Sequence, residues 1–182
     1  EAKDIYTRGH SDRVSEYSVL IGKKLKLSDD ELKLLKIGGL FHDIGKIGIP
    51  DSILLKTSKL TDDEYNEIKK HPSIGAHILE NSSIFKDIIP IVLYHHEKFD
   101  GYGYPEKLKG EDIPFLARIV AVADTFDAMT SKRSYRDALP LDIVKQEFIK
   151  FSGTQFDPVV AKAFLEILEF NYNDIKLIMK KY

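Results

Sequence analysis

Signals that start helices recur along this chain and constrain its fold more than any other feature. Ser28 and Thr61 each precede a glutamate by three residues, which is the pattern of a capping box at a helix N-terminus. His71 and Asp157 are each followed by proline, and we interpret both pairs as an N-cap with proline in the first turn. No stretch alternates apolar and polar residues between turn signals, as a half-buried strand would. The sequence therefore predicts an all-α fold.

Apolar residues at helical spacing, together with glycine and proline, set the expected helix bounds. We expect the first helix to end near Leu25 and the second to run from Ser28 to about Ile44, where Gly45 stops it. Residues 97–113 contain three glycines and a proline and predict a long loop, a feature that is often functional in compact domains. The other predicted helices follow Thr61 or span 71–81, 88–96, 115–129, 141–151, a stretch from 158 onward, and 174–180.

The composition is that of one globular domain. The chain has 182 residues, of which 43% are hydrophobic and 31% are charged. Its net charge of −2 argues against a DNA-binding protein. No apolar run approaches the roughly 18 residues of a membrane span, so we expect a cytoplasmic protein with no membrane segment. The chain has no cysteine, so any metal must be held by His, Asp, Glu, backbone or water.

Two adjacent pairs of metal-ligating residue types are present. His42 and Asp43 lie together at a predicted helix end, and His95 and His96 lie together just before the glycine-rich loop. Asp124 interrupts the most apolar predicted helix, where a carboxylate is costly unless it is paired or bound to a metal. A lone histidine on a helix is more often packed or solvated than ligating, but the two pairs together favour metal binding.

These residues and two further histidines, His10 and His71, fall about one predicted helix apart. Each would therefore come from a different helix, which is how helical bundles build dinuclear metal sites in their cores. Nitrogen and oxygen donors with at least four imidazoles suit iron, manganese, cobalt or zinc better than calcium or magnesium. The sixth histidine, His77, lies outside any motif, and we interpret it as an ordinary helix residue.

Several segments resemble one known family. Residues 41–46, Phe-His-Asp-Ile-Gly-Lys, resemble the signature of the HD superfamily of metal-dependent phosphohydrolases. Residues 95–105, with His-His-Glu followed by Asp-Gly and Gly-Tyr-Pro, are similar to the second signature of its HD-GYP subgroup. Further matching segments are 9–11, 71–72 and 123–136, so the resemblance covers about residues 7–160 in one order.

The resemblance implies a single HD-GYP domain over residues 1–182, built as a helical bundle with a metal site in its core. The domain core would span about 7–160, and C-terminal helices at 158–182 would pack on it. We expect the domain to be excised from a longer regulatory protein, because the chain opens without Met or a helix cap. The implied activity is hydrolysis of cyclic di-GMP to linear pGpG, with GMP as a further product, by attack of a metal-bridged hydroxide on phosphorus.

By the same resemblance, two divalent metal ions would share this site, with iron or manganese expected. Family members that hold a third metal carry a carboxylate four residues before the first histidine, where this chain has Tyr6, so we expect two ions. One carboxylate would bridge the ions. The first ion would be held by His10, His42, Asp43 and Asp124, and the second by Asp43, His71, His95 and His96.

Lys46 and Asp43 are the implied catalytic residues. Lys46 follows Asp43 by three residues, so the two share one face if the helix continues that far. Lys46 would neutralise the substrate phosphate or protonate the leaving oxygen; the alternative is a solvated lysine stabilised by the helix dipole. Three acidic motif residues would orient the ligands from behind, namely Glu97, Asp100 and Asp127.

The resemblance also implies substrate-binding residues. Arg133 and Arg136 would grip phosphates, since arginine suits bidentate phosphate contacts; the alternative is two solvated loop arginines. Tyr104 would contact the substrate by stacking on a base. The Gly103-Tyr104-Pro105 loop would also contact diguanylate cyclase domains; the alternative is a rigid turn beside the metal site.

Two other functions stay open at this stage. A weakly catalytic cyclic di-GMP receptor or partner-binding module could use the same fold with a degenerate site, although every expected ligand of the two ions is present. An HD-type nucleotidase would act on mononucleotides, although the second signature and the paired arginines favour a ligand with two phosphates. The physiological metal, the choice between cyclic di-GMP and mixed cyclic dinucleotides, and homodimer formation also stay open.

Overall fold

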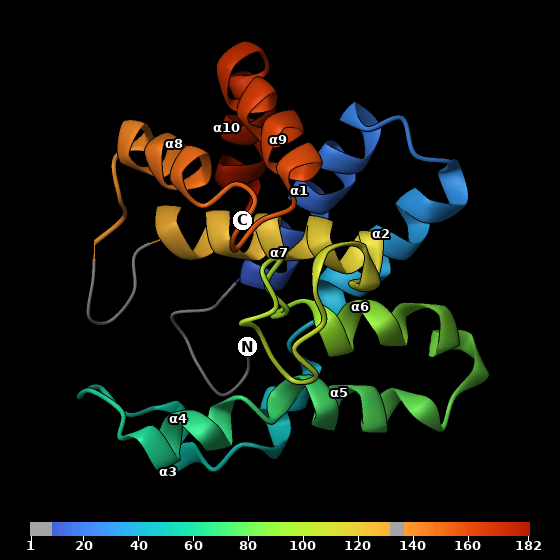
Figure 1. Ribbon diagram of the computed structural model, residues 1–182, viewed down its shortest axis with the longest axis vertical. Helices are drawn as coiled ribbons and strands as arrows, with labels where there is room; N and C mark the ends of the chain where they lie inside the picture. The colour runs from blue at the N-terminus through green and yellow to red at the C-terminus, as the bar shows by residue number, and fades with distance from the viewer. Residues whose placement is uncertain (1–8, 132–136) are drawn as a thin grey trace.

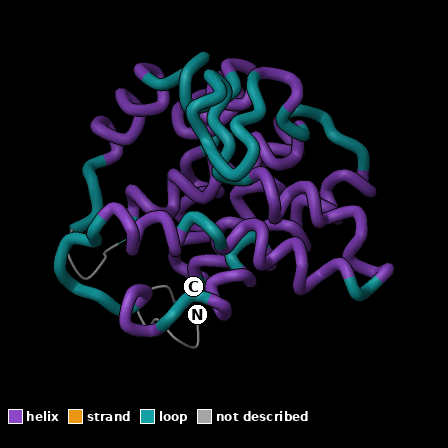
Figure 2. The backbone as a smooth tube through the Cα atoms, turned by 60° about the horizontal axis from the view of Figure 1, so that its bottom comes forward, coloured by secondary structure: helices purple, strands orange, loops and turns teal. Residues whose placement is uncertain are grey.

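The computed structural model describes residues 9–131 and 137–182 (Figure 1), and over these residues the all-α prediction is confirmed. Figure 2 shows helices joined by loops, and the only strand-like pairing in the described part of the chain is an isolated bridge between Ser152 and Phe156. Within the same ranges, no helix has the length and apolar character needed to cross a membrane. The α-helices are α1 (His10–Lys24), α2 (Asp29–Phe41), α3 (Asp51–Leu54), α4 (Asp62–Ile68), α5 (His71–Glu80), α6 (Ile89–Tyr94), α7 (Phe115–Thr130), α8 (Leu141–Lys150), α9 (Pro158–Phe170) and α10 (Tyr172–Lys181).

Local capping signals place most of these helices. The side chains of Ser28 and Thr61 accept hydrogen bonds from the backbone N–H three residues later, and both predicted capping boxes are complete. Asp157 accepts hydrogen bonds from two backbone N–H groups in the first turn of α9, so its N-cap role is confirmed. Single turns carry too little apolar periodicity to be predicted, which explains why α3 and the 3-10 helices η2 (Ile44–Gly48), η3 (Ser83–Ile88) and η4 (Gly110–Asp112) were missed.

The predicted end of the second helix is wrong. α2 ends at Phe41 instead of Ile44, and the chain continues into the tighter turn η2. Gly45 explains the change, because a Cβ atom there would lie only 1.8 Å from the carbonyl oxygen of His71. Only glycine allows η2 to pack backbone to backbone against α5, and this contact brings residue 43 next to the start of α5.

The predicted N-cap role of His71 is also wrong. His71 is the first residue of α5, and Lys70 occupies the N-cap position. The Nδ1 atom of His71 lies 2.8 Å from the carbonyl oxygen of Ile68, so the ring contacts the preceding turn rather than the N–H groups of its own helix.

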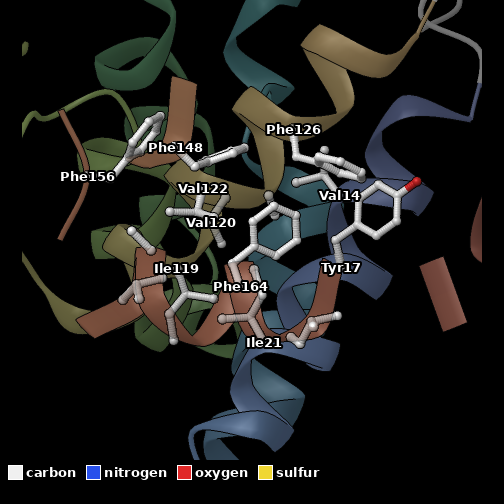
Figure 3. Close-up of a cluster of buried hydrophobic side chains, with 14 of the residues drawn as sticks. Val14, Tyr17, Ile21, Ile119, Val120, Val122, Phe126, Phe148, Phe156 and Phe164 are labelled. Carbon is white, nitrogen blue, oxygen red and sulfur yellow. The ribbon is translucent and has the colours of Figure 1, made fainter. Parts of the chain in front are cut away.

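A continuous row of aromatic rings forms the centre of the main hydrophobic core (Figure 3). Tyr17 of α1 and Phe126 of α7 have ring centroids 5.1 Å apart, and Phe126 lies 4.9 Å from Phe164 of α9. Phe148 of α8 continues the row, 5.1 Å from Phe164 and 4.7 Å from Phe156. Aromatic pairs at such distances stabilise a core beyond the area that they bury. The row therefore fixes α1 against α7, the two helices that carry the first and last predicted ligands.

A smaller apolar cluster holds α5 and α6 against the end of α2. Leu79, Ile88 and Val92 are buried in it, and Phe41 packs on them. Leu34 of α2 packs against both clusters, so α2 connects them. The helices that carry the predicted ligands are thus held by two apolar clusters joined through α2.

The helices are arranged around α7. In Figure 1, α7 crosses the middle of the molecule, with α8 to α10 on one side and α5 and α6 on the other. α3 and α4 lie at the end of the molecule farthest from α8 to α10. Ile175 and Ile178 of α10 belong to the main core.

Replacing Phe164 by Ala should lower the free energy of unfolding by about 3–5 kcal/mol, because the side chain is fully buried between Phe126 and Phe148. Denaturant titration followed by circular dichroism measures this change. Phe170 lies on the same helix and is 77% exposed, so Phe170→Ala is the matched control and should change stability by less than about 0.5 kcal/mol. Equal losses in the two variants would contradict the assigned core.

Candidate metal centre

Helix ends supply every predicted ligand except Asp124, which lies within α7. His10 and His71 are the first residues of α1 and α5. The adjacent pairs 42–43 and 95–96 begin at the C-caps of α2 and α6. Side chains at helix ends can meet at one point while their helices run in different directions, and this arrangement brings distant parts of the chain together.

The Asp43 carboxylate stands between two groups of histidines. Its Oδ2 atom lies 3.4 Å from Nε2 of His42 and 3.7 Å from Nε2 of His10. Its Oδ1 atom lies 3.2 Å from Nε2 of His71 and 4.0 Å from Nε2 of His95. One carboxylate thus faces two positions at which a metal ion could bind. Donor atoms within 4.8 Å of one another define the two groups, His10 with His42 and Asp43, and Asp43 with His71, His95 and His96.

Asp124 completes the first group. Its Oδ1 atom lies 3.3 Å from Nε2 of His10 and 3.9 Å from Nε2 of His42. The fold therefore brings together all of the residues that the sequence predicted as ligands, although they come from four different helix ends and one helix interior. The described residues thus contain a His/Asp cluster that could hold metal ions.

Three imidazole rings are held from behind, with Nε2 facing the centre. The Nδ1 atoms of His42, His71 and His95 lie 2.7, 2.8 and 2.8 Å from the carbonyl oxygen three residues earlier. A carbonyl oxygen only accepts hydrogen bonds, so Nδ1 carries the proton and Nε2 presents a lone pair. The Nε2 atom of His42 is buried and has no hydrogen-bond partner among the described residues. An unpaired buried nitrogen beside two carboxylates fits a metal ligand.

Asp127 holds the fourth ring, that of His10. Its Oδ2 atom lies 2.8 Å from Nδ1 of His10, and its two oxygens accept hydrogen bonds from Arg13 at 2.6 and 3.0 Å. The hydroxyl of Ser131 donates to the same carboxylate at 3.2 Å. This geometry agrees with the orienting role predicted for Asp127. The sequence analysis missed Arg13, although its position three residues after His10 places both on one face of α1.

Among the described residues, the side-chain hydrogen bonds of Glu97 and Asp100 go to loop backbone and not to a ligand ring, so their orienting role stays a prediction. Oε1 of Glu97 accepts a hydrogen bond from the backbone N–H of Glu106 at 2.7 Å. Oδ1 of Asp100 accepts one from the backbone N–H of Tyr102 at 3.0 Å. Both carboxylates hold the glycine-rich loop, because a loop backbone without helical partners needs other acceptors.

Lys46 reaches the centre from a 3-10 turn. Its Nζ atom lies 2.6 Å from Oδ2 of Asp43, and its side chain is 33% exposed. Asp43 and Lys46 do not share the face of an α-helix, because α2 ends at Phe41. They are still neighbours, because residues three apart also lie on one side of a 3-10 helix. The remaining predicted residues Tyr6, Arg133 and Arg136 lie outside the described ranges.

Two ligands of the first group, His10 and Asp43, are charged. Burial alone would lower the pKa of His10, but hydrogen bonds with Asp124 and Asp127 raise it to about 9. Burial would raise the pKa of Asp43, yet Lys46 and the neighbouring histidines hold it well below its usual range. In the absence of metal the His10 ring is therefore protonated at neutral pH, and a metal ion that binds its Nε2 atom must displace a proton.

Two histidines of the second group, His95 and His96, are neutral. Burial lowers the pKa of His95 well below its usual value and that of His96 to about 3. Both rings are therefore neutral at physiological pH, which is the state in which imidazole binds metals. An ion that binds Nε2 of His10 therefore displaces a proton, whereas an ion that binds His95 or His96 displaces none from those two rings.

Comparison with known proteins places the chain in a family. The HD domain family matches residues 3–160, most of the chain, so this chain belongs to the HD domain family. A solved structure of Bd1817, an HDG"Y"P protein from Bdellovibrio bacteriovorus, has a TM-score of 0.71 and 25% identity to it. That similarity covers 88% of this chain and 51% of the Bdellovibrio chain.

Curated relatives are similar over almost all of this chain. It is 43% identical, over 91% of its length, to the cyclic di-GMP phosphodiesterase response regulator RpfG of Xanthomonas campestris. It is 37% identical, over 96% of its length, to the 3'3'-cGAMP-specific phosphodiesterase 3 of Vibrio cholerae. These alignments cover 44% and 39% of the two relatives, so the chain spans less than half of their length.

Replacing Gly45 by Ala should push η2 away from α5 and move Asp43 from its place beside His71, because the new Cβ would meet backbone atoms that cannot yield. We expect metal affinity to fall, with a loss of unfolding free energy of about 1–3 kcal/mol. Metal titration and denaturant titration measure the two effects. Gly48→Ala is the matched control, since the nearest atoms to its Cβ would belong to the side chain of Ile74 and not to backbone. Equal effects in both variants would contradict a special role of Gly45.

Replacing Asp127 by Asn should weaken metal binding at the His10 side about 10–100-fold, because an amide oxygen cannot serve both His10 and Arg13 as the carboxylate does. Titration of the metal-free protein with Mn²⁺ measures the affinity, and circular dichroism checks the fold. Asp100→Asn is the control, because the Asp100 carboxylate accepts a hydrogen bond from the loop backbone at Tyr102, which an amide oxygen can also accept. An Asp127→Asn protein that binds metal as tightly as the wild type would refute the positioning role.

Proposed function

We propose that this chain hydrolyses cyclic di-GMP to linear pGpG at a centre of two divalent metal ions. The observation that carries the proposal is the Asp43 carboxylate, whose two oxygens face different groups of histidines. Membership in the HD domain family supports a metal-dependent phosphohydrolase. The relative from Xanthomonas, which carries the name of a cyclic di-GMP phosphodiesterase, supports the substrate.

The two ligand groups would each hold one ion, with Asp43 shared between them. Donors of nitrogen and oxygen with five imidazoles suit iron or manganese, which we propose as the physiological metals. When bound, such ions supply a water of lowered pKa and neutralise charge on the phosphate. The chain contributes the geometry, because the carbonyl oxygens behind three rings and Asp127 behind the fourth keep each Nε2 atom aimed at the centre.

Lys46 is our candidate for the proton donor. Hydrolysis to pGpG adds water to phosphorus and breaks its bond to the O3′ atom of one ribose, which must then take up a proton. The Nζ atom of Lys46 donates a hydrogen bond to Asp43, and the lysine side chain is partly exposed, so it lies at the edge of the centre where a substrate would enter. There it can donate a proton to O3′ as the P–O bond breaks.

Other substrate and partner contacts remain predictions. We propose that Arg133 and Arg136 bind substrate phosphates and that Tyr104 contacts a base. Contact with diguanylate cyclase domains through the Gly103-Tyr104-Pro105 loop is supported by the neighbouring Tyr102, which is 84% exposed. We also propose further cleavage of pGpG to GMP and formation of a homodimer.

Asp43→Asn should reduce hydrolysis of cyclic di-GMP at least about 100-fold, because it removes the negative charge that both ions would share. The assay incubates reduced, metal-defined protein with cyclic di-GMP and separates products by chromatography. His77→Ala is the control, since this histidine is 81% exposed and outside the centre. Turnover by Asp43→Asn at the wild-type rate would reject the metal mechanism.

Parallel incubations separate the alternatives that the sequence left open. Binding of cyclic di-GMP without any product would favour the receptor. Faster cleavage of a mixed cyclic GMP-AMP than of cyclic di-GMP would favour the substrate named for the Vibrio relative. Release of phosphate from mononucleotides alone would favour the nucleotidase. The proposal expects pGpG from cyclic di-GMP as the main product.

A further inference from the structure

His96 differs from the other histidines of the centre in how its ring is held. The rings of His10, His42, His71 and His95 each have a hydrogen-bond partner at Nδ1. No hydrogen bond from a described residue reaches the ring of His96. Without such a partner, an imidazole can rotate about its χ2 angle and turn its nitrogen away from a metal.

The ring of Tyr104 takes the place of that partner. It lies on the His96 ring with centroids 4.8 Å apart and an angle of 29° between the planes, a stacked arrangement. On its other sides His96 meets His71 at 5.0 Å, edge to face, and His95 at 4.1 Å. The Tyr104 ring lies against one face of the His96 imidazole and restricts its rotation about χ2. In the other four rings, a hydrogen bond at Nδ1 restricts the same rotation.

The loop backbone holds Tyr104 in this position. Its backbone N–H donates to the carbonyl oxygen of His96 at 3.2 Å, so the loop folds back onto its own start. Gly103 makes this possible, because a Cβ atom there would lie 2.3 Å from the backbone nitrogen of Lys98 and 2.5 Å from Cα of Glu97. The Gly-Tyr sequence thus combines a close backbone contact with an aromatic ring placed over a ligand.

Glu97 holds the returning half of the same loop. Its side chain is buried, and its Oε1 atom accepts the hydrogen bond from the backbone N–H of Glu106. Burial raises the pKa of this carboxyl group, while the facing backbone amides of Glu106, Leu108 and Lys107 oppose the rise. A buried carboxylate is retained here because loop amides surround it.

The outer part of the loop is anchored to the connection between α8 and α9. The backbone N–H groups of Phe99 and Asp100 donate to the carbonyl oxygens of Gln155 and Thr154 at 3.2 and 2.8 Å. The N–H of Gly110 closes the loop on Phe99 at 2.8 Å. The loop is therefore fixed at both ends and can hold a side chain in one place.

We propose that Tyr104 is a positioning residue of the metal centre, whose ring orients the His96 imidazole, and that Glu97 acts through the loop to keep Tyr104 there. The inference rests on the proposed metal centre and deepens it. The proposal gives residues 103–105 a structural role at the metal centre, in addition to any contact with substrate or partner.

The test compares Tyr104→Phe with Tyr104→Leu during titration of the metal-free protein with Co²⁺, followed by visible absorption. Phe keeps the stacked ring and should bind both ions as the wild type does. Leu removes the planar face and should weaken one of the two ions roughly tenfold and change its absorption spectrum. Tyr102→Leu is the control, because Tyr102 lies in the same loop and is 84% exposed.

Glu97 gives a second, independent pair of variants if Tyr104→Leu does not fold. Glu97→Ala should weaken the same ion roughly tenfold, and Glu97→Gln, which keeps an acceptor oxygen, should restore the affinity. Wild-type Co²⁺ affinity in Tyr104→Leu together with a raised KM for cyclic di-GMP would overturn the proposal and assign Tyr104 to the substrate. A wild-type protein that binds no Co²⁺ would instead overturn the metal centre itself.

Discussion

The shared carboxylate of Asp43 is the interaction on which the rest of this structure depends. It is largely buried among imidazoles, and its negative charge persists because Lys46 and the surrounding histidines offset the cost of burial. The backbone sets the position of Asp43, because α2 ends at Phe41 and η2, which contains Gly45, packs directly against the backbone of α5. A single glycine thus connects the packing of two helices to the position of the central ligand.

The two sides of the centre are held by different parts of the fold. The aromatic row from Tyr17 to Phe156 fixes α1 and α7, whereas a separate cluster fixes α5 and α6, and α2 packs against both. Each of the five histidine rings of the centre is also supported on its outer side, by a carbonyl oxygen, by the Asp127 carboxylate or by the Tyr104 ring. Orientation of ligands by such outer contacts is what lets a metal site form without rearrangement.

The sequence predicted the fold class, most helices and all of the clustered ligands, because capping boxes, apolar spacing and adjacent His-Asp and His-His pairs are local signals. It failed where contacts between distant segments decide the outcome. The early end of α2 depends on the approach of Gly45 to α5, and the role of Arg13 depends on a carboxylate more than a hundred residues away. Glu97 was predicted to orient ligands, and the sequence did not show that its side chain accepts a hydrogen bond from the loop backbone, a contact that only the folded loop reveals.

The central claim is that one carboxylate joins two metal positions. Crystals of the wild-type protein grown with Mn²⁺ and measured at the manganese absorption edge would test it most directly. The account predicts two anomalous peaks, one beside Oδ2 of Asp43 near His42 and His10 and the other beside Oδ1 near His71 and His95. A single peak, or peaks away from this carboxylate, would contradict it.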